Sequence, residues 1–451
     1  MSRKEHILLV GSGGREDALA HAMSKSERCE RLYCAPGNVG IERWAEIVEL
    51  DVNNHAAVVQ WCIGNAITLV VIGPDQFLAD GLADPLRAAG IDVFGPSQYA
   101  AQLESSKSFA KAAMQRFDIP TASYQTFTSA QRADAEEYVR SLGAPLVVKA
   151  DGLAAGKGVV VAETVEEGIE AVRSILDGAF GSAGASIVVE QFLHGEEASV
   201  FAISDGTTFI TLAPAQDHKR ICDGDTGKNT GGMGAYAPAP IVTPEVLGFV
   251  EDSIIRPLID GMRAEGHPFV GCLFVGLMIQ ELNKVRQIQE LQHYNSGINP
   301  IPLANVVEFN ARFGDPETQV VLPIIDGDVL ALLASAARGS LDTSVISSVA
   351  AQHACTVILA SSGYPDAFEK GIEITGIDEA ETDESITVYY AGVAKREGSL
   401  VTNGGRVVAV TAVDTSLSGA RARAYEACNH IHFEGKTYRR DIAARAFKVT
   451  A

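Results

Sequence analysis

Short apolar runs separated by glycine-rich or polar turns make up most of this chain. In the N-terminal third, the runs Ile7 to Val10, Arg31 to Ala35 and Leu69 to Ile72 have the length and composition of buried strands. An alanine-rich helical stretch, Ala18 to Ser24, follows the first run. Strands that alternate with helices predict an open parallel sheet, in which ligands bind at the carboxyl ends of the strands.

The turn after the first run reads Gly-Ser-Gly-Gly-Arg-Glu over residues 11–16. Backbone N–H groups at a helix N-terminus attract phosphate, and an arginine adds to that attraction. The turn is not a dinucleotide fingerprint, because Glu16 occupies the place of the third glycine. We therefore expect a small phosphorylated ligand at Gly13, Gly14 and Arg15, with a surface arginine as the alternative.

Two further polar residues follow predicted strands of the same sheet. Asn38 lies in the turn after the second strand, and Asp75 lies in the turn after the third. Either could bind sugar hydroxyls at the carboxyl edge of the sheet. Taken alone, each is better explained as a turn or helix-cap residue.

The most informative pattern is Val-Val-Lys-Ala-Asp-Gly-Leu-Ala-Ala-Gly-Lys-Gly-Val-Val-Val-Ala, over residues 147–162. Two β-branched runs flank a glycine loop, which predicts a β-hairpin. The loop contains Gly152, Gly156, Lys157 and Gly158. It is not a Walker phosphate loop, because the spacing is one residue short and a strand, not a helix, follows. Together with Lys149 the loop suits a lid over a triphosphate, and an ordinary hairpin is the alternative.

The pattern around this hairpin predicts one helix before it and two strands after it. The helix covers Ala100 to Phe117 and includes Lys107. The first strand, Ile187 to Phe192, contains Glu190, and Glu197 lies seven residues further along the chain. Such a pair could hold adenine and ribose, although strand-end glutamates are more often solvated.

Residues 216–236 form a long polar stretch with six glycines. Connections of this length are usually functional or disordered. The charged and amide side chains here are Asp217, Lys219, Arg220 and Asn229. They suit a zwitterion or a phosphate better than an apolar ligand, and disorder is the alternative.

A third polar pattern lies on a predicted strand. Glu308, Asn310 and Arg312 are spaced at i, i+2 and i+4, so they should project from one face. A carboxylate and an amide oxygen side by side suit Mg²⁺, which also takes phosphate oxygens and water. An arginine on the same face suits a clamp on a transferring phosphoryl group.

The C-terminal third again alternates helices and strands. Helices are predicted over Val329 to Arg338 and Ser418 to Ile431, and strands over Cys355 to Ala360, Ile386 to Ala391 and Arg406 to Ala412. This order predicts a small mixed sheet covered by helices. The region contains no catalytic group of its own that the pattern can identify.

Composition limits the possible functions. With 451 residues, 47% of them hydrophobic, the chain should form about two to four domains. Its net charge of −21 opposes binding to nucleic acid or anionic membranes, so local loops must bind phosphate. Seven cysteines without a C-x-x-C pair indicate reduced thiols and a cytoplasmic location. No apolar run is long enough to span a membrane.

Taken together, these motifs resemble the glycinamide ribonucleotide synthetase (phosphoribosylamine-glycine ligase) family of the ATP-grasp superfamily. The matching segments are residues 11–16, 35–40, 94–97, 147–159, 216–220, 229–236, 308–319, 401–407 and 438–442. The resemblance implies an N-terminal phosphoribosylamine-binding domain with an open parallel sheet over residues 1–105. It also implies an ATP-grasp domain over 106–333, with a lid at about 122–195, and a small mixed α/β domain over 334–451 that closes the sugar-phosphate cleft.

The resemblance also implies a reaction and a set of site residues. ATP would phosphorylate glycine, and the amine of 5-phosphoribosylamine would then displace phosphate in de novo purine biosynthesis. The ATP contacts would be Lys107, Lys149, Gly152, Gly156, Lys157, Gly158, Glu190, the Leu193 backbone and Glu197. The substrate contacts would be Gly13, Gly14, Arg15, Asn38, Asp75, Asp217, Lys219 and Asn229. Glu308 and Asn310 would bind Mg²⁺ or Mn²⁺, and the catalytic roles would fall to Arg312, Lys149 and Asp217.

Other interpretations remain open. A different ATP-grasp carboxylate-amine ligase would share the nucleotide and metal residues, and a catalytically silent nucleotide-binding relative would keep only binding. In each case the partners are small molecules, and a monomer is expected.

Three departures from the family pattern stand out. Asp17 replaces the usual histidine beside the sugar-phosphate turn, where a carboxylate would repel phosphate unless it points away. Tyr390 lies where the family often has the histidine of Phe-His-Ala-Gly-Thr. An insertion at about Glu290 to Asn305 lengthens a hairpin, and its polar composition predicts a surface excursion in which His293 is not a ligand.

Overall fold

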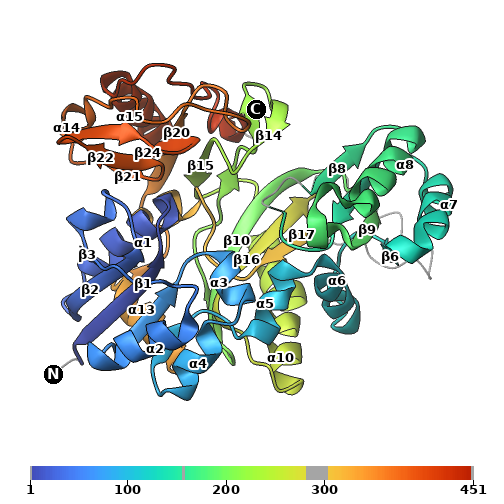
Figure 1. Cartoon of the computed structure of the whole chain (residues 1–451), viewed down its shortest axis with the longest axis horizontal. Coiled ribbons are helices and arrows are strands. Elements are labelled where there is room, and N and C mark those ends of the chain that lie inside the picture. Colours follow the sequence, from blue (N-terminus) through green and yellow to red (C-terminus); the bar gives the residue numbers. More distant parts are fainter. Residues whose placement is uncertain (1–2, 155–157, 281–302, 448–451) are drawn as a thin grey trace.

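The computed structural model describes residues 3–154, 158–280 and 303–447. The N-terminal sheet and the C-terminal domain lie on one side of a central sheet, and a separate lid sheet lies on the other (Figure 1). Within the described residues, no helix combines the length and the apolar character needed to cross a bilayer. The N-terminal, central and C-terminal sheets, together with the lid sheet, surround the regions in which the predicted site residues lie.

The N-terminal sheet is open and parallel, as predicted, with the order β3-β2-β1-β4-β5. Its strands are β1 (Glu5–Gly11), β2 (Cys29–Pro36), β3 (Glu46–Ile47), β4 (Leu69–Ile72) and β5 (Asp92–Phe94). The helices that connect them are α1 (Gly14–Ser24), α2 (His55–Gly64), α3 (Asp75–Ala79) and α4 (Ala83–Ala88). Ile7–Val10 of β1 and the whole of β4 are apolar, and both faces of these strands are buried in hydrophobic clusters. The turns after β1, β2 and β4 share the carboxyl edge.

The predicted helix over residues 100–117 is in fact two helices, α5 (Gln98–Ser105) and α6 (Lys107–Arg116). Ser106 leaves the helical region, with φ −138° and ψ 111°, and its Oγ accepts a hydrogen bond from the Phe109 N–H at 3.2 Å. A serine can therefore end one helix and cap the next, which an amphipathic pattern alone does not reveal. The break places Lys107 at the first turn of α6.

The lid sheet has the order β6-β9-β7-β8, and its paired strands are all antiparallel. Its strands are β6 (Tyr124–Thr128), β7 (Leu146–Ala150), β8 (Val159–Ala162) and β9 (Ser186–Gln191). Helices α7 (Arg132–Leu142) and α8 (Val165–Ser174) cover one face and bury a separate small core. The β7–β8 pair confirms the predicted glycine hairpin.

The central sheet has the order β11-β10-β16-β17 and is also antiparallel. Its strands are β10 (Glu196–Asp205), β11 (Phe209–Thr211), β16 (Val270–Ile279) and β17 (Ala304–Asn310). Helices α9 (Pro244–Val250) and α10 (Arg256–Ala264) pack on this sheet. The β16–β17 hairpin carries the predicted insertion, most of which, with His293, lies outside the described residues.

The C-terminal sheet differs from the expected mixed sheet, because its described pairs are all antiparallel, in the order β12-β15-β20-β24-β21. Its strands are β12 (Gln216–Asp217), β15 (Gly234–Ala237), β20 (His353–Ala360), β21 (Ile386–Tyr390) and β24 (Arg406–Asp414). Helix α15 (Leu417–His430) packs against β20 and β24. The predicted strands and helix of this region are confirmed.

The stretch over residues 216–236 is not a structureless loop. Strands β12 and β15 join it to the C-terminal sheet, and a hairpin of β13 (Arg220–Cys222) and β14 (Thr226–Asn229) projects between them. Short paired strands in a glycine-rich sequence leave little apolar periodicity, which explains why the pattern predicted a loop.

Helix α13 (Val329–Ala337) buries its apolar side chains against the N-terminal sheet and α1. The expected domain boundary between residues 333 and 334 falls inside this continuous helix. Helix α13 also contacts β10 and β16, so it joins the N-terminal sheet to the central sheet.

Candidate active site

A small cavity lies between strands β10, β12, β16 and β17. Its polar lining brings together residues that are far apart in the sequence, namely Glu197, Ser199, Asp217, Lys219 and Glu308. A wider hollow on the surface along β6 contains none of the predicted site residues. The cavity, and not the wider hollow, is therefore the candidate site.

Opposite charges surround this cavity. Lys219 Nζ lies 2.5 Å from Glu197 Oε2. Burial alone would lower the pKa of Lys219, but Glu197 and Asp217 raise it well above its usual value. Burial raises the pKa of Asp217, although Lys219 opposes this shift. Burial would also raise the pKa of Glu308, but Lys219, with two further lysines, holds it below its ordinary value. Glu308 is therefore ionised and suited to bind a cation.

The start of α6 is tied to the glycine hairpin. Lys107 donates its backbone N–H to the Asp151 carbonyl at 3.0 Å, and its Nζ lies 3.4 Å from the Gly152 carbonyl oxygen. The Asp151 carboxylate accepts hydrogen bonds from Ser106, Ser108 and Ser186. The predicted phosphate contacts Lys107 and Gly152 are therefore neighbours.

Close packing explains two glycines of the hairpin. A Cβ at Gly152 would lie 2.9 Å from the Ala183 Cα, and a Cβ at Gly158 would lie 2.7 Å from the Ala154 Cβ. Larger residues at either place would force the loop to shift. Gly156 and Lys157 lie outside the described residues, so their predicted contacts with ATP remain predictions.

Glu190 is buried and forms ion pairs with two lysines. One partner is Lys149, and the other is Lys111, whose Nζ lies 2.5 Å from Glu190 Oε2. Burial would raise the pKa of Glu190, but the two lysines hold it below its ordinary value. Sequence reasoning missed Lys111, although it lies one helical turn after Lys107, a spacing that could have indicated it. Leu193 follows β9 and is half-buried.

Glu308 and Asn310 lie on β17, as predicted. Arg312 lies beyond the end of the strand, yet its Nη2 is 3.4 Å from Asn310 Oδ1. Its stronger partner is Glu104, with Nη2 2.7 Å from Oε1, a contact that sequence reasoning did not find. Burial would lower the pKa of Arg312, and Glu104 raises it instead. The three predicted side chains therefore lie together. Glu308 and Asn310 do so because they alternate along β17, whereas Arg312 joins them from beyond the end of the strand.

A second buried carboxyl group near the cavity was also missed. Ser199 Oγ donates to Glu317 Oε1 at 3.4 Å, and Glu317 is only 4% exposed. Burial and the nearby Asp217 raise the pKa of Glu317 to about 8. Glu317 lies in the polar pattern after β17, so its place in the sequence gave a weak signal.

The glycine turn after β1 already contains an anion. The Gly13 N–H donates to Glu16 Oε2 at 2.7 Å, and Arg15 Nε lies 2.5 Å from Glu16 Oε1. Arg15 also donates to the Phe313 carbonyl at 3.2 Å. A Cβ at Gly14 would lie 2.8 Å from Gln319 Nε2. The turn is thus packed against the segment that follows β17.

Asn38 uses its whole side-chain amide within the protein. Its Nδ2 donates to the carbonyls of Ser12 and Tyr390, and its Oδ1 accepts from the N–H groups of Gly40 and Ile41. This is the behaviour of the turn residue that the sequence offered as the alternative. Asp75 begins α3 at the carboxyl end of β4 and is half-buried.

Asp17 points away from the glycine turn, which resolves the expected repulsion. Its carboxylate accepts hydrogen bonds from Arg43 at 3.0 Å, Trp44 at 2.8 Å and the Tyr390 N–H at 2.7 Å. The Arg43 guanidinium also lies 4.4 Å from the centre of the Tyr390 ring. Burial raises the pKa of Asp17 to about 6. The two departures from the family pattern therefore contact each other and join α1 to β21.

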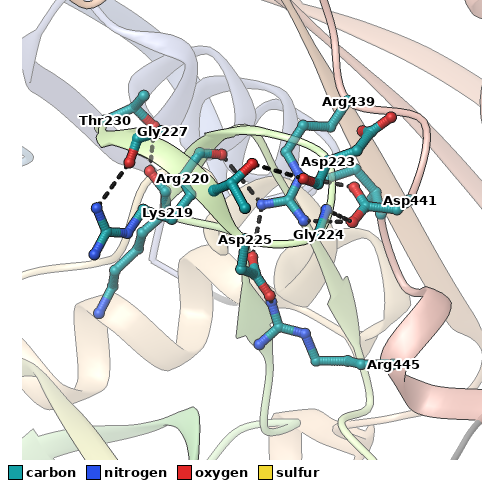
Figure 2. Close-up of polar contacts among 12 residues, drawn as sticks. Lys219, Arg220, Asp223, Gly224, Asp225, Gly227, Thr230, Arg439, Asp441 and Arg445 are labelled. Atoms are coloured by element: carbon teal, nitrogen blue, oxygen red, sulfur yellow. Dashed lines mark hydrogen bonds and ion pairs between the residues drawn. The ribbon is translucent and has the colours of Figure 1, made fainter.

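The C-terminal segment holds the β13–β14 hairpin in place (Figure 2). Arg439 is 1% exposed; it donates to both oxygens of Asp441, to Asp225 Oδ1 at 2.7 Å and to the Arg220 carbonyl at 3.1 Å. The preceding carbonyl, that of Lys219, accepts two hydrogen bonds from Thr230. The backbone beside Lys219 is thus fixed from both sides, whereas Asn229 at the end of β14 is exposed.

An antiparallel lid sheet with a glycine hairpin and a buried lysine, opposed to a central sheet in which β17 carries a carboxylate and an amide, defines an ATP-grasp protein. The phosphoribosylglycinamide synthetase models match this chain as an N domain over residues 5–104, an ATP-grasp domain over 105–318 and a C domain over 354–445. The chain belongs to the phosphoribosylglycinamide synthetase family.

Individual relatives agree with this assignment. The chain is 49% identical over 440 residues to phosphoribosylamine-glycine ligase of Agrobacterium fabrum, covering 98% of each protein. The crystal structure of phosphoribosylamine-glycine ligase from Thermotoga maritima matches with a TM-score of 0.81 and 32% identity, over 97% of this chain and 100% of that one. The biotin carboxylase domain of Hydrogenobacter thermophilus 2-oxoglutarate carboxylase matches with a TM-score of 0.71 and 15% identity, over 97% of this chain and 92% of that one. At this low identity, the match shows a shared fold only.

Proposed function

We propose that this chain joins glycine to 5-phosphoribosylamine at the expense of ATP, giving glycinamide ribonucleotide, ADP and phosphate in purine biosynthesis. The observation that carries the proposal is the cavity that brings Glu197, Asp217, Lys219 and Glu308 together in a member of this family. A free carboxylate is a poor electrophile, so its activation as an acyl phosphate explains the need for ATP.

In the first step, an oxygen of the glycine carboxylate attacks the γ-phosphorus of ATP, and ADP leaves with the electrons of the broken bond. Lys107 and Lys149 would hold the phosphates, since Lys107 lies beside the Gly152 carbonyl of the glycine hairpin and Lys149 beside the Val307 carbonyl of β17. Glu190 and the Leu193 backbone would hold adenine, and Glu197 the ribose. Arg312 would offset the charge that develops on the transferring phosphoryl group.

Glu308 and Asn310 fit a hard divalent cation. They are adjacent oxygen donors on β17, and Glu308 is ionised. Within residues 3–154, 158–280 and 303–447, no three His, Cys, Asp or Glu side chains are arranged to hold a metal ion by themselves. Mg²⁺ or Mn²⁺ would therefore complete its shell with phosphate oxygens and water, and would polarise the phosphoryl group.

In the second step, the amine of phosphoribosylamine attacks the carbonyl carbon of glycyl phosphate. Phosphate leaves with the electrons of the carbon-oxygen bond, and the nitrogen loses a proton as the amide forms. Asp217 would bind the glycine ammonium, with Lys219 and Asn229 as further contacts. Gly13, Gly14, Arg15 and Asp75 would contact the sugar phosphate, and Asn38 would do so only by giving up one of its partners within the protein.

The test is ADP release from ATP and Mg²⁺, measured with glycine, with phosphoribosylamine formed from ribose 5-phosphate and ammonia, and with both. We expect release only with both substrates, together with a product that has the mass of glycinamide ribonucleotide. Release with glycine and a different amine would indicate another ligase. Nucleotide binding without turnover would indicate a silent relative.

We also propose three domains, with the ATP-grasp part beginning near residue 106 and the C-terminal domain beginning after α13. A cytoplasmic location is supported by the cysteines, all seven of which are free. We retain a monomer as the expected state, which light scattering of the purified protein would test.

A further inference from the structure

Three charged side chains lie almost fully out of solvent where the lid sheet meets β17. The side chains of Lys111, Lys149 and Glu190 are 3%, 6% and 5% exposed. Glu190 pairs with both lysines, one at each carboxylate oxygen. With both lysines protonated, the group has one more positive than negative charge. Burial lowers the pKa of Lys111 to about 8 while Glu190 opposes that shift, so Lys111 is mostly charged at neutral pH.

Both lysines are anchored to neighbouring carbonyls of β17. Lys149 Nζ donates to the Val307 carbonyl at 3.2 Å. Lys111 Nζ donates to Thr121 Oγ1 at 2.7 Å, and that hydroxyl donates to the Val306 carbonyl at 2.6 Å. Glu190 comes from β9 of the lid sheet. The group therefore joins the lid to the strand that carries Glu308.

The net positive charge of these three buried side chains favours the approach of an anion, in addition to Glu308, whose pKa Lys149 already helps to lower. A nucleotide phosphate supplies such an anion. To bind it, Lys149 must release at least part of its interaction with Glu190, whose carboxylate would then need another partner. Lys111 is that partner. Without Lys111, Glu190 would have Lys149 as its main partner, and every phosphate contact of Lys149 would leave a buried carboxylate unpaired.

We propose that Lys111 is a positioning residue for the nucleotide: it holds Glu190 in place so that Lys149 is free to bind a phosphate group. This inference rests on the proposed function, because the ligand it assumes is ATP. Lys111 itself has no role in the reaction, and it acts only through Glu190 and Lys149.

The first experiment compares Lys111→Met with the parent protein. We expect ADP, measured with Mg²⁺ by calorimetry, to bind about tenfold to a hundredfold more weakly, and the KM for ATP to rise by a similar factor. The KM for glycine should change by less than about twofold. The matched control is Arg116→Met on the same helix, where the replaced side chain is 42% exposed and pairs with Glu265; it should leave both nucleotide measurements unchanged.

A second experiment separates this role from simple structural support. Lys111→Met combined with Glu190→Gln removes both the cation and the carboxylate, and so frees Lys149. Inorganic tripolyphosphate, which has no adenine, should bind this double variant more tightly than it binds Lys111→Met, by about tenfold. Loss of structure alone would give no such recovery. Lys111→Arg, which keeps the charge, should retain most of the ADP affinity.

If Lys111→Met does not fold, Lys111→Gln takes its place, because it can keep the hydrogen bond to Thr121 while removing the charge. An ADP affinity within about twofold of the parent in either folded neutral variant would overturn the proposal, as would a double variant no better than the single one. A parent protein that binds no ADP would instead overturn the proposed function itself.

Discussion

Two regions of this molecule contain similar residue types and use them differently. Where the lid sheet meets β17, Lys149 and Lys111 share one carboxylate, so their positive charge exceeds the negative charge of Glu190. At the glycine turn after β1, Glu16 accepts a hydrogen bond from the N–H of Gly13, the residue before α1, and pairs with Arg15. In the first region the two lysines outnumber the carboxylate they share, whereas in the second region one carboxylate is matched by one arginine.

This difference shows that the type of a residue does not reveal whether the residue contacts a ligand or joins two parts of the protein. Asn38 has four partners within the protein, two of them from the turn it closes. Asp17, with three partners, joins α1 to β21. A ligand at the glycine turn must therefore displace existing partners, while a nucleotide at Lys149 would complete a set of charges. The predictions below test that contrast.

The largest effect is expected at the metal strand. Glu308→Ala should lower turnover by about a thousandfold or more, because it removes a carboxylate ligand of the proposed cation, which would offset the charge of the transferring phosphoryl group. The free energy of unfolding should change little. Steady-state rates in saturating Mg²⁺ and urea titrations measure both quantities, and Glu170→Ala, an exposed glutamate on α8, is the control. Near-normal turnover would remove Glu308 from the proposed metal site.

The next effect concerns the link between α1 and β21. Asp17 has a pKa of about 6 in the folded protein against an ordinary value of 3.8, so the folded state binds its proton more tightly. Its contribution to stability is therefore greatest below pH 4 and falls as the pH rises to 6. The free energy of unfolding of the parent, minus that of Asp17→Asn, should fall by up to about 3 kcal/mol over this interval. Urea titrations across the interval measure it, and a constant difference would contradict the burial of Asp17.

A smaller loss of stability is expected from Arg439→Met. The variant leaves Asp225 and Asp441 without the cation they share, at a cost of about 2 kcal/mol. Because the same arginine fixes the backbone after Lys219, the KM for glycine should also rise. Arg440→Met, which changes an exposed neighbour, is the matched control. A KM for glycine that stays constant would show that the hairpin does not position Lys219.

The smallest effect is expected at the glycine turn. Arg15→Ala should raise the KM for phosphoribosylamine by about tenfold, because it removes a cation near the proposed phosphate site. The KM for ATP should remain almost unchanged. Initial rates with each substrate varied in turn give the two values. Equal increases in both would mean that Arg15 serves the contact with Phe313 and not the sugar phosphate.

Much of the fold could be predicted from local pattern. The parallel N-terminal sheet, the hairpin of β7 and β8 and the principal C-terminal strands each follow from apolar runs and glycine turns. The break at Ser106 and the short strands within residues 216–236 could not, because caps and short pairings leave no periodic signal. The grouping of Glu308, Asn310 and Arg312 was predicted, although Arg312 joins it from beyond the strand.

The sequence by itself determined which residue types are available for the chemistry: a glycine hairpin with lysines, and a carboxylate beside an amide on one strand. Only the tertiary structure decided how they are paired. Lys111 reaches Glu190 from another element, Glu104 takes Arg312, and Asp17 turns toward Tyr390. These choices depend on distance and burial between segments remote in the chain, and a buried charge takes whatever partner the packing brings to it.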